Sequence, residues 1–304
     1  MSWEVLYVIP NISIQDPFDT EYLSIVPYGD QRIRRIIAAN ATAAALLNGF
    51  RSETGTRIKP SAIICREDSP ESVVNLNAVV DFRNIYAVSC LVSGNARAII
   101  SQNITEPVYS DYFDFYPLTL RRNRRGLIID SPALLGLWPN PRRVYGSTYA
   151  HIFISDIIRA NPDQVLLTKL IKQWNYRYRS PAKNSWITRI LFRSLEIAYQ
   201  ALLSPFRSSR IYEYGTHLSL WVSSFETLVQ GRREKYVGFK DVLSLLRGFV
   251  WGNKELNNRK YWTAKLRTAP RGSLVMKIYL EIYNARNSFL HGNPVTPKTP
   301  VAEE

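Results

Sequence analysis

Three polar side chains near the end of the last predicted helix could carry acid–base chemistry: Arg286, Asn287 and His291. Asn287 and His291 are four residues apart and lie on nearly the same face of a helix, so Asn287 could orient the imidazole through a hydrogen bond. Histidine has a pKa near neutrality and serves as a general base or acid. A guanidinium forks onto phosphate oxygens. These residue types fit a reaction at a phosphodiester.

Cleavage of RNA without a metal ion is the reaction that we expect from this set. A base removes the proton of a ribose 2′-OH, and that oxygen attacks the adjacent phosphorus. Negative charge then grows on the non-bridging oxygens, where a fixed guanidinium stabilises it. Arg286 would supply that positive charge, His291 would act as base or acid, and Asn287 would orient or bind. DNA lacks the 2′-OH and should not be cut.

The spacing of Arg286 and His291 raises a geometric problem. The two residues are five apart, which places them about 140° from each other around an ideal helix. The long arginine side chain must curl round, or the last turn must be irregular where Gly292 ends the helix. A second copy of the chain would also solve the problem, because a twofold axis brings two Arg–His pairs to one cleft. A homodimer is therefore one of three arrangements that fit this spacing.

A purely structural interpretation of the same residues stands beside this one. His291 could sit at the helix end because a cation there favours the negative end of the dipole. Arg286 could pair with Glu281 or Glu226. Of the other histidines, we interpret His217 as a surface group at the start of a helix and His151 as a buried structural residue.

Composition argues against several other classes of site. The chain has two cysteines and three histidines, and they show no zinc-ligand spacing. It also lacks a Gly-rich phosphate loop and a GxSxG motif, so we expect neither a metal ion nor a cofactor. Two cysteines, no secretory signal and no apolar run of about 18 residues predict a cytoplasmic protein without a membrane partner.

Positive charge is concentrated in one part of the chain. The net charge is +14; residues 1–120 hold 9 Lys/Arg and 13 Asp/Glu, and residues 121–304 hold 30 and 12. A basic region of this size is typical of a polyanion binder, here RNA, although a solvated basic surface is the plainer explanation. Six arginines are candidate RNA contacts, and exposed positions would explain them equally well: Arg121, Arg122, Arg124, Arg125, Arg177 and Arg179.

The first 160 residues predict a mixed α/β domain. Apolar and β-branched stretches predict strands over 4–9, 61–65, 109–120 and 126–129. An Ala-rich stretch without Gly or Pro predicts one helix over 31–47. Residues 72–92 are apolar without a clear period, which fits either a helix or a strand. Residues 132–141 predict a loop.

Residues 161–304 predict a helical bundle, so the fold class is α+β with a division near residue 160. Asn161, Pro162 and Asp163 suit a helix start. Apolar stripes and Gly or Pro stops then predict helices over 161–174, 186–203, 216–229, 239–250 and 273–290.

The segment 282–293 resembles the signature of HEPN domains, through Arg286-Asn287 followed by His291-Gly292. These pairs also resemble the Apea-like and abortive-infection branches, and residues 218–228 resemble an earlier core helix of that branch. The resemblance covers about residues 161–304. It implies a helical bundle, a composite ribonuclease site between two copies, and products with a 2′,3′-cyclic phosphate and a 5′-hydroxyl. A toxin or antiviral defence role and an antitoxin or regulatory partner are also implied.

Two other functions fit the same observations. HEPN-like bundles also serve as nucleic-acid-binding or nucleotide-binding modules without cleaving, and a basic half could instead meet an acidic protein in an assembly. Because residues 1–160 differ in charge and pattern from the rest, we expect them to sense a trigger or restrain the nuclease.

Overall fold

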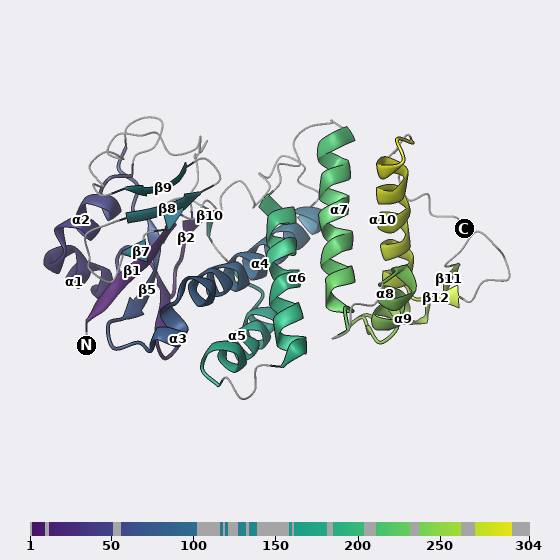
Figure 1. Cartoon of the computed structure of the whole chain (residues 1–304), viewed down its shortest axis with the longest axis horizontal. Coiled ribbons are helices and arrows are strands. Elements are labelled where there is room, and N and C mark those ends of the chain that lie inside the picture. Colours follow the sequence, from purple (N-terminus) through teal and green to yellow (C-terminus); the bar gives the residue numbers. More distant parts are fainter. Residues whose placement is uncertain are drawn as a thin grey trace. The chain divides into compact units, whose positions relative to one another are not determined.

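The computed structural model describes residues 2–9, 12–50, 56–101, 116–117, 119–120, 127–131, 134–138, 158–159, 161–180, 185–203, 211–231, 237–262 and 271–293. The chain divides into two compact units, Met1–Pro181 and Ala182–Glu304 (Figure 1). Helices and an antiparallel sheet together confirm the α+β class. None of the described helices is long and apolar enough to cross a membrane.

The first unit is built on a five-stranded sheet whose order is β3-β4-β5-β1-β6. The strands are β1 (Trp3–Ile9), β3 (Phe18–Asp19), β4 (Leu23–Val26), β5 (Ser61–Arg66) and β6 (Tyr116–Pro117). All neighbouring strands in it are antiparallel. Every residue of β4 is buried, which requires cover on both faces of the sheet. The predicted strands over 4–9 and 61–65 are confirmed as β1 and β5, and the strand order places both inside the sheet.

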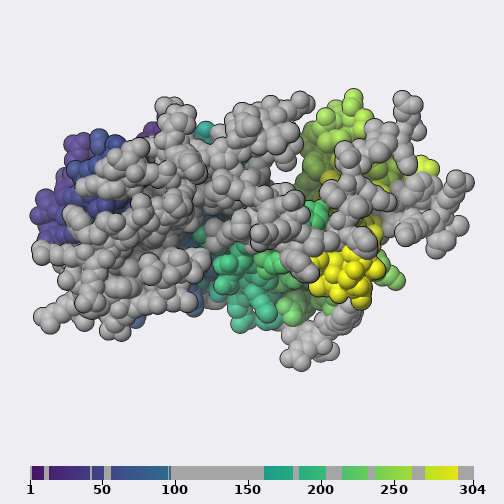
Figure 2. Space-filling model, turned by 90° about the horizontal axis from the view of Figure 1, so that it is seen from above, coloured from purple at the N-terminus to yellow at the C-terminus, as the bar shows by residue number. Residues whose placement is uncertain are grey.

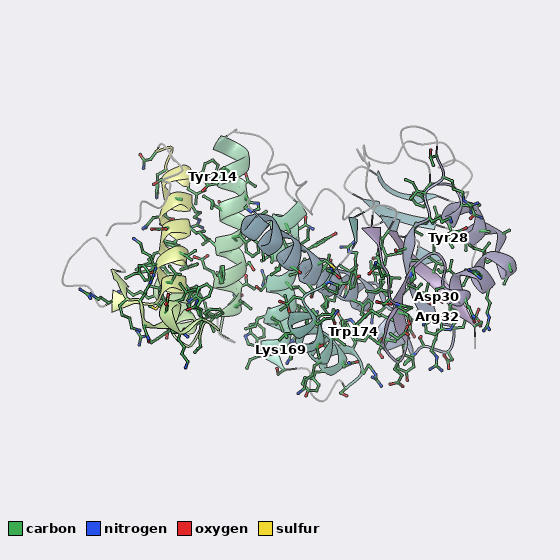
Figure 3. All side chains as sticks on the ribbon, turned by 180° about the vertical axis from the view of Figure 1, so that it is seen from behind. Tyr28, Asp30, Arg32, Lys169, Trp174 and Tyr214 are labelled. Atoms are coloured by element: carbon green, nitrogen blue, oxygen red, sulfur yellow. The ribbon has the colours of Figure 1, made fainter. Side chains whose placement is uncertain are left out.

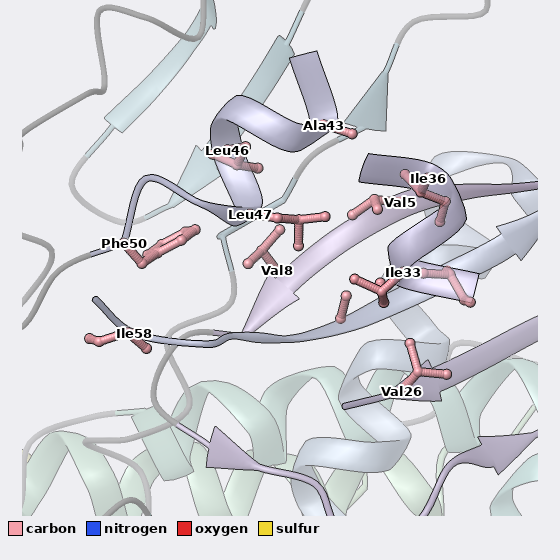
Figure 4. Packing of buried hydrophobic residues seen from close by; sticks show 12 residues of the cluster. Val5, Val8, Val26, Ile33, Ile36, Ala43, Leu46, Leu47, Phe50 and Ile58 are labelled. Atoms are coloured by element: carbon pink, nitrogen blue, oxygen red, sulfur yellow. The ribbon is translucent and has the colours of Figure 1, made fainter. Parts of the chain in front are cut away.

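Two short helices cover one face of this sheet, α1 (Gln31–Ala39) and α2 (Ala41–Leu47). Their apolar residues pack on Val5, Val8 and Ile64 in one core (Figure 4). The sequence predicted a single helix over 31–47. Asn40 divides it, because its backbone is extended (φ −134°, ψ 102°) and its side chain accepts a hydrogen bond from the Ala43 N–H at 3.1 Å. A side chain of this kind competes with the helix for backbone partners.

The stretch that fitted either helix or strand forms α3 (Glu71–Val74) and the 26-residue α4 (Leu76–Ser101). Helix α4 is apolar around much of its circumference, and such a helix shows no clear period. It packs against α5 (Gln164–Tyr178), where the Trp174 indole N–H donates to the Ala78 carbonyl at 2.8 Å. Helix α5 thus belongs to the first unit, and the division lies at Pro181 instead of near residue 160.

Short strands complete the first unit. Strand β2 (Ile12–Ser13) pairs in parallel with β10 (Ile158–Arg159). Strands β7 (Thr119–Leu120), β8 (Leu127–Ser131) and β9 (Leu134–Trp138) form a three-stranded antiparallel sheet. The predicted loop over 132–141 was therefore wrong for Leu134–Trp138. The flanking prolines indicated a loop, but the six residues between Pro132 and Pro139 leave room for a five-residue edge strand.

The second unit contains α6 (Trp186–Leu203), α7 (Ile211–Leu228), α8 (Phe239–Leu246), α9 (Lys254–Asn258) and α10 (Leu274–Leu290), with the strand pair β11 (Tyr261–Trp262) and β12 (Arg271–Gly272). Helices α6 and α7 meet at two buried serines. The Ser194 hydroxyl donates to the Ser224 carbonyl at 2.8 Å, and the Ser224 hydroxyl donates to the Ser194 carbonyl at 3.0 Å. Helix α8 packs on α10 through Val242, Leu246, Met276 and Tyr279.

Helices α7 and α10 approach each other most closely at Gly215. A Cβ atom at that position would lie 2.2 Å from the Phe289 ring. Further along, the Phe225 ring contacts the Tyr279 ring, with centroids 5.4 Å apart. From the first contact to the second, the residue number increases along α7 and decreases along α10, so the two helices are antiparallel. Gly215 thus allows the C-terminal end of α10 to lie flat against α7.

We expect Gly215→Ala to lower the stability of the protein by about 1–3 kcal/mol, because the added methyl group overlaps a packed ring. Chemical denaturation of the full chain measures this. Gly231→Ala is the matched control, since nothing lies within 4 Å of a Cβ there, and we expect it to stay within about 0.5 kcal/mol of the parent. Equal stabilities of the two variants would contradict the close approach.

His217 lies inside α7 and is half-buried, so the interpretation of His217 as a surface group at a helix start was wrong. The Trp221 indole N–H donates to His217 Nε2 at 2.9 Å. An Nε2 that accepts a hydrogen bond carries no proton, so the ring is neutral. Burial lowers the pKa of His217, and a backbone hydrogen bond at Ala201 opposes that effect in part.

The lowered pKa of His217 predicts a pH-dependent stability. The unfolded chain takes up a proton at this ring near pH 6.5, before the folded protein does, so stability is full above pH 6.5 and falls as the pH drops below it. We expect His217→Gln, which keeps an acceptor for Trp221, to lose less stability between pH 7.5 and 5.5 than the parent. Thermal unfolding at both pH values measures the difference, and parallel losses would refute it.

Candidate functional site

The C-terminal end of α10 carries the three residues that the sequence singled out, and hydrogen bonds fix how the helix ends. The Gly292 N–H donates to the Phe289 carbonyl at 3.0 Å, and the Asn293 N–H donates to the Ser288 carbonyl at 2.8 Å. Gly292 has a φ of +70°. This bonding pattern, with glycine in the left-handed region, is the Schellman motif. It holds His291 as the last residue before the chain turns.

His291 is exposed at the helix end, and residues of α10 reach the surface in Figure 2. Its backbone N–H donates to the Asn287 carbonyl at 3.0 Å. In the described part of the chain, its imidazole makes no side-chain hydrogen bond or ion pair. The ring is thus accessible to solvent.

Arg286 and Asn287 are brought together directly. Arg286 Nη1 donates to Asn287 Oδ1 at 3.1 Å, and the guanidinium lies over the Tyr283 ring, 6.0 Å from its centroid. The Asn287 oxygen that we expected to orient His291 thus accepts from Arg286. Tyr283 was not among the predicted site residues, although the spacing of three residues on a helix could have identified it.

Glu226 on α7 is the acid that influences Arg286. It is half-buried, and burial raises its pKa while the positive charge of Arg286 lowers it. Helical side chains lean toward the N-terminus of their own helix, so those of Glu226 and Arg286 lean toward each other across two antiparallel helices. The other acid considered, Glu281, instead forms an ion pair with Lys277 at 3.2 Å.

The guanidinium of Arg286 keeps its charge available. Among the described residues it forms no ion pair with an acid, and its Nε atom is buried without a hydrogen-bond partner. The pKa of the neighbouring Tyr279 hydroxyl is raised by burial and by Glu226, so that group stays neutral and does not compensate the cation. An arginine that is positioned but not neutralised can receive an anion such as a phosphate.

The other six predicted RNA contacts lie outside this site. Arg121, Arg122, Arg124 and Arg125 fall outside the described residues. Arg177 Nη1 pairs with the buried Asp81 at 3.0 Å, and Arg179 pairs with Glu21. Arg179 also lies over the Tyr22 ring at 5.3 Å. Both arginines are therefore engaged within the first unit. His151 also lies outside the described residues.

No protein-family model, curated protein or solved structure matches the chain. In the ranges that the structure describes, no three His, Cys, Asp or Glu side chains gather in a way that could hold a metal ion.

We expect Arg177→Gln to lower the stability of the first unit by about 1–3 kcal/mol. The buried Asp81 carboxylate would lose its ion pair with Arg177 and keep the hydrogen bond from the Tyr178 hydroxyl. Lys169→Gln, on an exposed part of the same helix, is the control (Figure 3). Denaturant unfolding measures both. Unchanged unfolding combined with weaker RNA binding would instead favour the RNA contact that the sequence suggested.

Proposed function

We propose that the protein is a metal-independent endoribonuclease of HEPN type. The observation that carries this proposal is the end of α10, where a charged guanidinium without an ion-pair partner among the described residues lies five residues from an exposed imidazole. The basic charge of residues 121–304 supports RNA as the substrate.

In the proposed reaction His291 takes the proton of a ribose 2′-OH, and the resulting oxygen attacks the adjacent phosphorus. Arg286 donates two hydrogen bonds to the non-bridging oxygens as their charge grows. The bond from phosphorus to the 5′-oxygen breaks, and the leaving oxygen receives a proton from the imidazolium. The products are a 2′,3′-cyclic phosphate and a 5′-hydroxyl, and no external reactant is consumed.

The position of Arg286 supports a site shared between two copies. Its guanidinium lies over Tyr283, toward the N-terminus of α10, whereas His291 is the C-cap residue more than one turn beyond Arg286. A homodimer that pairs the ends of two α10 helices would let the arginine of one copy meet the histidine of the other. Asn287 and Tyr283 position the guanidinium, and Glu226 attracts it without forming an ion pair in the described part of the chain.

The first unit would then sense a trigger or restrain the nuclease, in a toxin or antiviral defence role with an antitoxin or regulatory partner. Its first 120 residues hold more acids than bases, 13 against 9, whereas residues 121–304 hold 12 against 30. This difference in charge supports such a division of labour. This part of the proposal fails if removal of the first unit, residues 1–181, leaves both activity and its control unchanged.

A second candidate is a nucleic-acid-binding or nucleotide-binding module that does not cleave. One observation favours it: Asn287 Oδ1 accepts from Arg286, so no described side chain fixes the orientation of the His291 ring. A general base usually needs such a partner.

We expect Arg286→Ala and His291→Ala each to lower RNA cleavage in EDTA by about 10²- to 10⁴-fold. Arg193→Ala, an exposed arginine on α6, is the matched control and should cleave like the parent. The assay follows a labelled RNA on a denaturing gel and identifies the cyclic phosphate at the new 3′ end. A DNA strand of the same sequence should remain intact.

The two candidates predict different outcomes. If parent and variants all bind RNA and all leave it intact, the ribonuclease proposal is refuted and the binding module stands. Retained binding to an acidic protein at high salt, without affinity for RNA at low salt, would refute both.

A further inference from the structure

The connection between α8 and α9 exposes an unusual group of large apolar side chains. Leu245, Phe249 and Val250 are 48%, 47% and 75% exposed. Arg247 and Lys254 are exposed beside them. We name these five residues the Phe249 surface. Neighbouring apolar groups on a protein surface commonly mark a binding site.

The Phe249 surface is held rigidly although it faces solvent. The Trp251 backbone N–H donates to Asn257 Oδ1 at 2.7 Å, and the Asn257 amide donates back to the Trp251 carbonyl. The Phe249 and Trp251 rings meet edge to face, with centroids 5.1 Å apart at 81°. The Phe249 ring thus has an ordered aromatic neighbour and is still about half exposed. A ligand that stacks on it loses little entropy in ordering the protein.

The charge around this ring is positive. Arg259 and Lys260 are exposed close by in sequence, in addition to Arg247 and Lys254. Two acids lie in residues 237–262. Asp241 caps α8, where its side chain accepts from the Gly238 N–H at 3.0 Å, and Glu255 is exposed in the first turn of α9, so the basic residues outnumber the acids. A second copy of the same basic surface would be repelled. A partner should therefore be negatively charged and carry flat apolar groups.

We propose that the Phe249 surface binds single-stranded RNA, with a base stacked on Phe249 and phosphates at Arg247 and Lys254. Unstacked bases and a phosphate backbone match the combination of an exposed aromatic ring with arginine and lysine. The inference rests on RNA as the ligand in the proposed function, and it does not require that the RNA be cleaved.

The surface lies at a distance from the candidate catalytic residues. Helix α8 packs on Met276 and Tyr279, in the N-terminal half of α10, whereas His291 ends that helix (Figure 1). Twelve to fifteen helical residues span about 20 Å, or about six stacked nucleotides. A strand that reaches both places is therefore longer than about six nucleotides, and the surface would select long single strands.

Binding is tested by fluorescence anisotropy with a labelled 15-nucleotide oligouridine that carries 2′-O-methyl groups and cannot be cleaved. We expect Phe249→Ala to raise Kd at least about fivefold, since one base–aromatic stack is lost. Phe249→Tyr should bind like the parent, and Phe249→Leu should bind like Phe249→Ala. Ile187→Ala, which removes a 72% exposed apolar side chain from α6, is the matched control and should leave Kd unchanged.

Two further measurements separate stacking from charge. Arg247→Gln should reduce the slope of log Kd against log salt by about one. Duplex RNA of equal length should show no effect of Phe249→Ala, because its bases are already stacked. Full binding by Phe249→Ala, or by Phe249→Leu, overturns the proposal. So does a change in self-association, measured by sedimentation, with no change in RNA affinity.

The outcome is distinct from that of the ribonuclease proposal. If the parent cleaves RNA, Phe249→Ala should raise KM for a 15-mer and leave kcat, together with cleavage of a trinucleotide, unchanged, whereas Arg286→Ala abolishes cleavage of both. If the parent does not cleave but Phe249-dependent binding persists, the inference holds and the ribonuclease proposal fails. If cleavage of the 15-mer is unaffected by Phe249→Ala, the inference fails and the ribonuclease proposal holds.

Discussion

The close approach of α10 to α7 at Gly215 determines where the candidate site lies. Because no side chain stands between the Gly215 backbone and the Phe289 ring, the last turn of α10 packs against α7 as far as Phe289. Leu290 and His291, which follow, are exposed. The Schellman motif then stops the helix at once. One glycine allows the packing and another allows the turn, and His291 stands between the packed turn and the turning chain.

Arg286 differs from three arginines of the first unit that form ion pairs. In the first unit, Arg177 and Arg179 each meet an acid, and Arg32 donates to both Asp30 and Asp19. These pairs fix helix ends and strands. In the second unit, Arg286 lies over the Tyr283 ring and donates to the Asn287 side-chain oxygen. It interacts with Glu226 electrostatically and forms no ion pair with it among the described contacts. A neutralised guanidinium stabilises a fold, whereas one that retains its charge is suited to an incoming anion.

Local signals predicted much of the fold. The apolar period of α6 and the end of α10 at Gly292 could be predicted from the sequence, because amphipathic stripes and capping residues act over a few neighbouring positions. The partner of α5 was not readable, since an apolar stripe does not say which helix covers it, and Trp174 turned out to face α4. The site was partly predictable. Types and spacing identified Arg286 and His291, but which side chains Arg286 and Asn287 contact depends on rotamers and on α7.

Ser194 and Ser224 have an effect beyond their own hydrogen bonds. They join α6 to α7. Helix α7 also carries Gly215, which packs against Phe289 of α10, so one continuous helix makes both contacts. A bulkier side chain at either serine would overlap the opposing backbone and disturb the packing of α7 on α6. A substitution at position 194 can therefore change how α7 supports the end of α10, although Ser194 lies on a third helix.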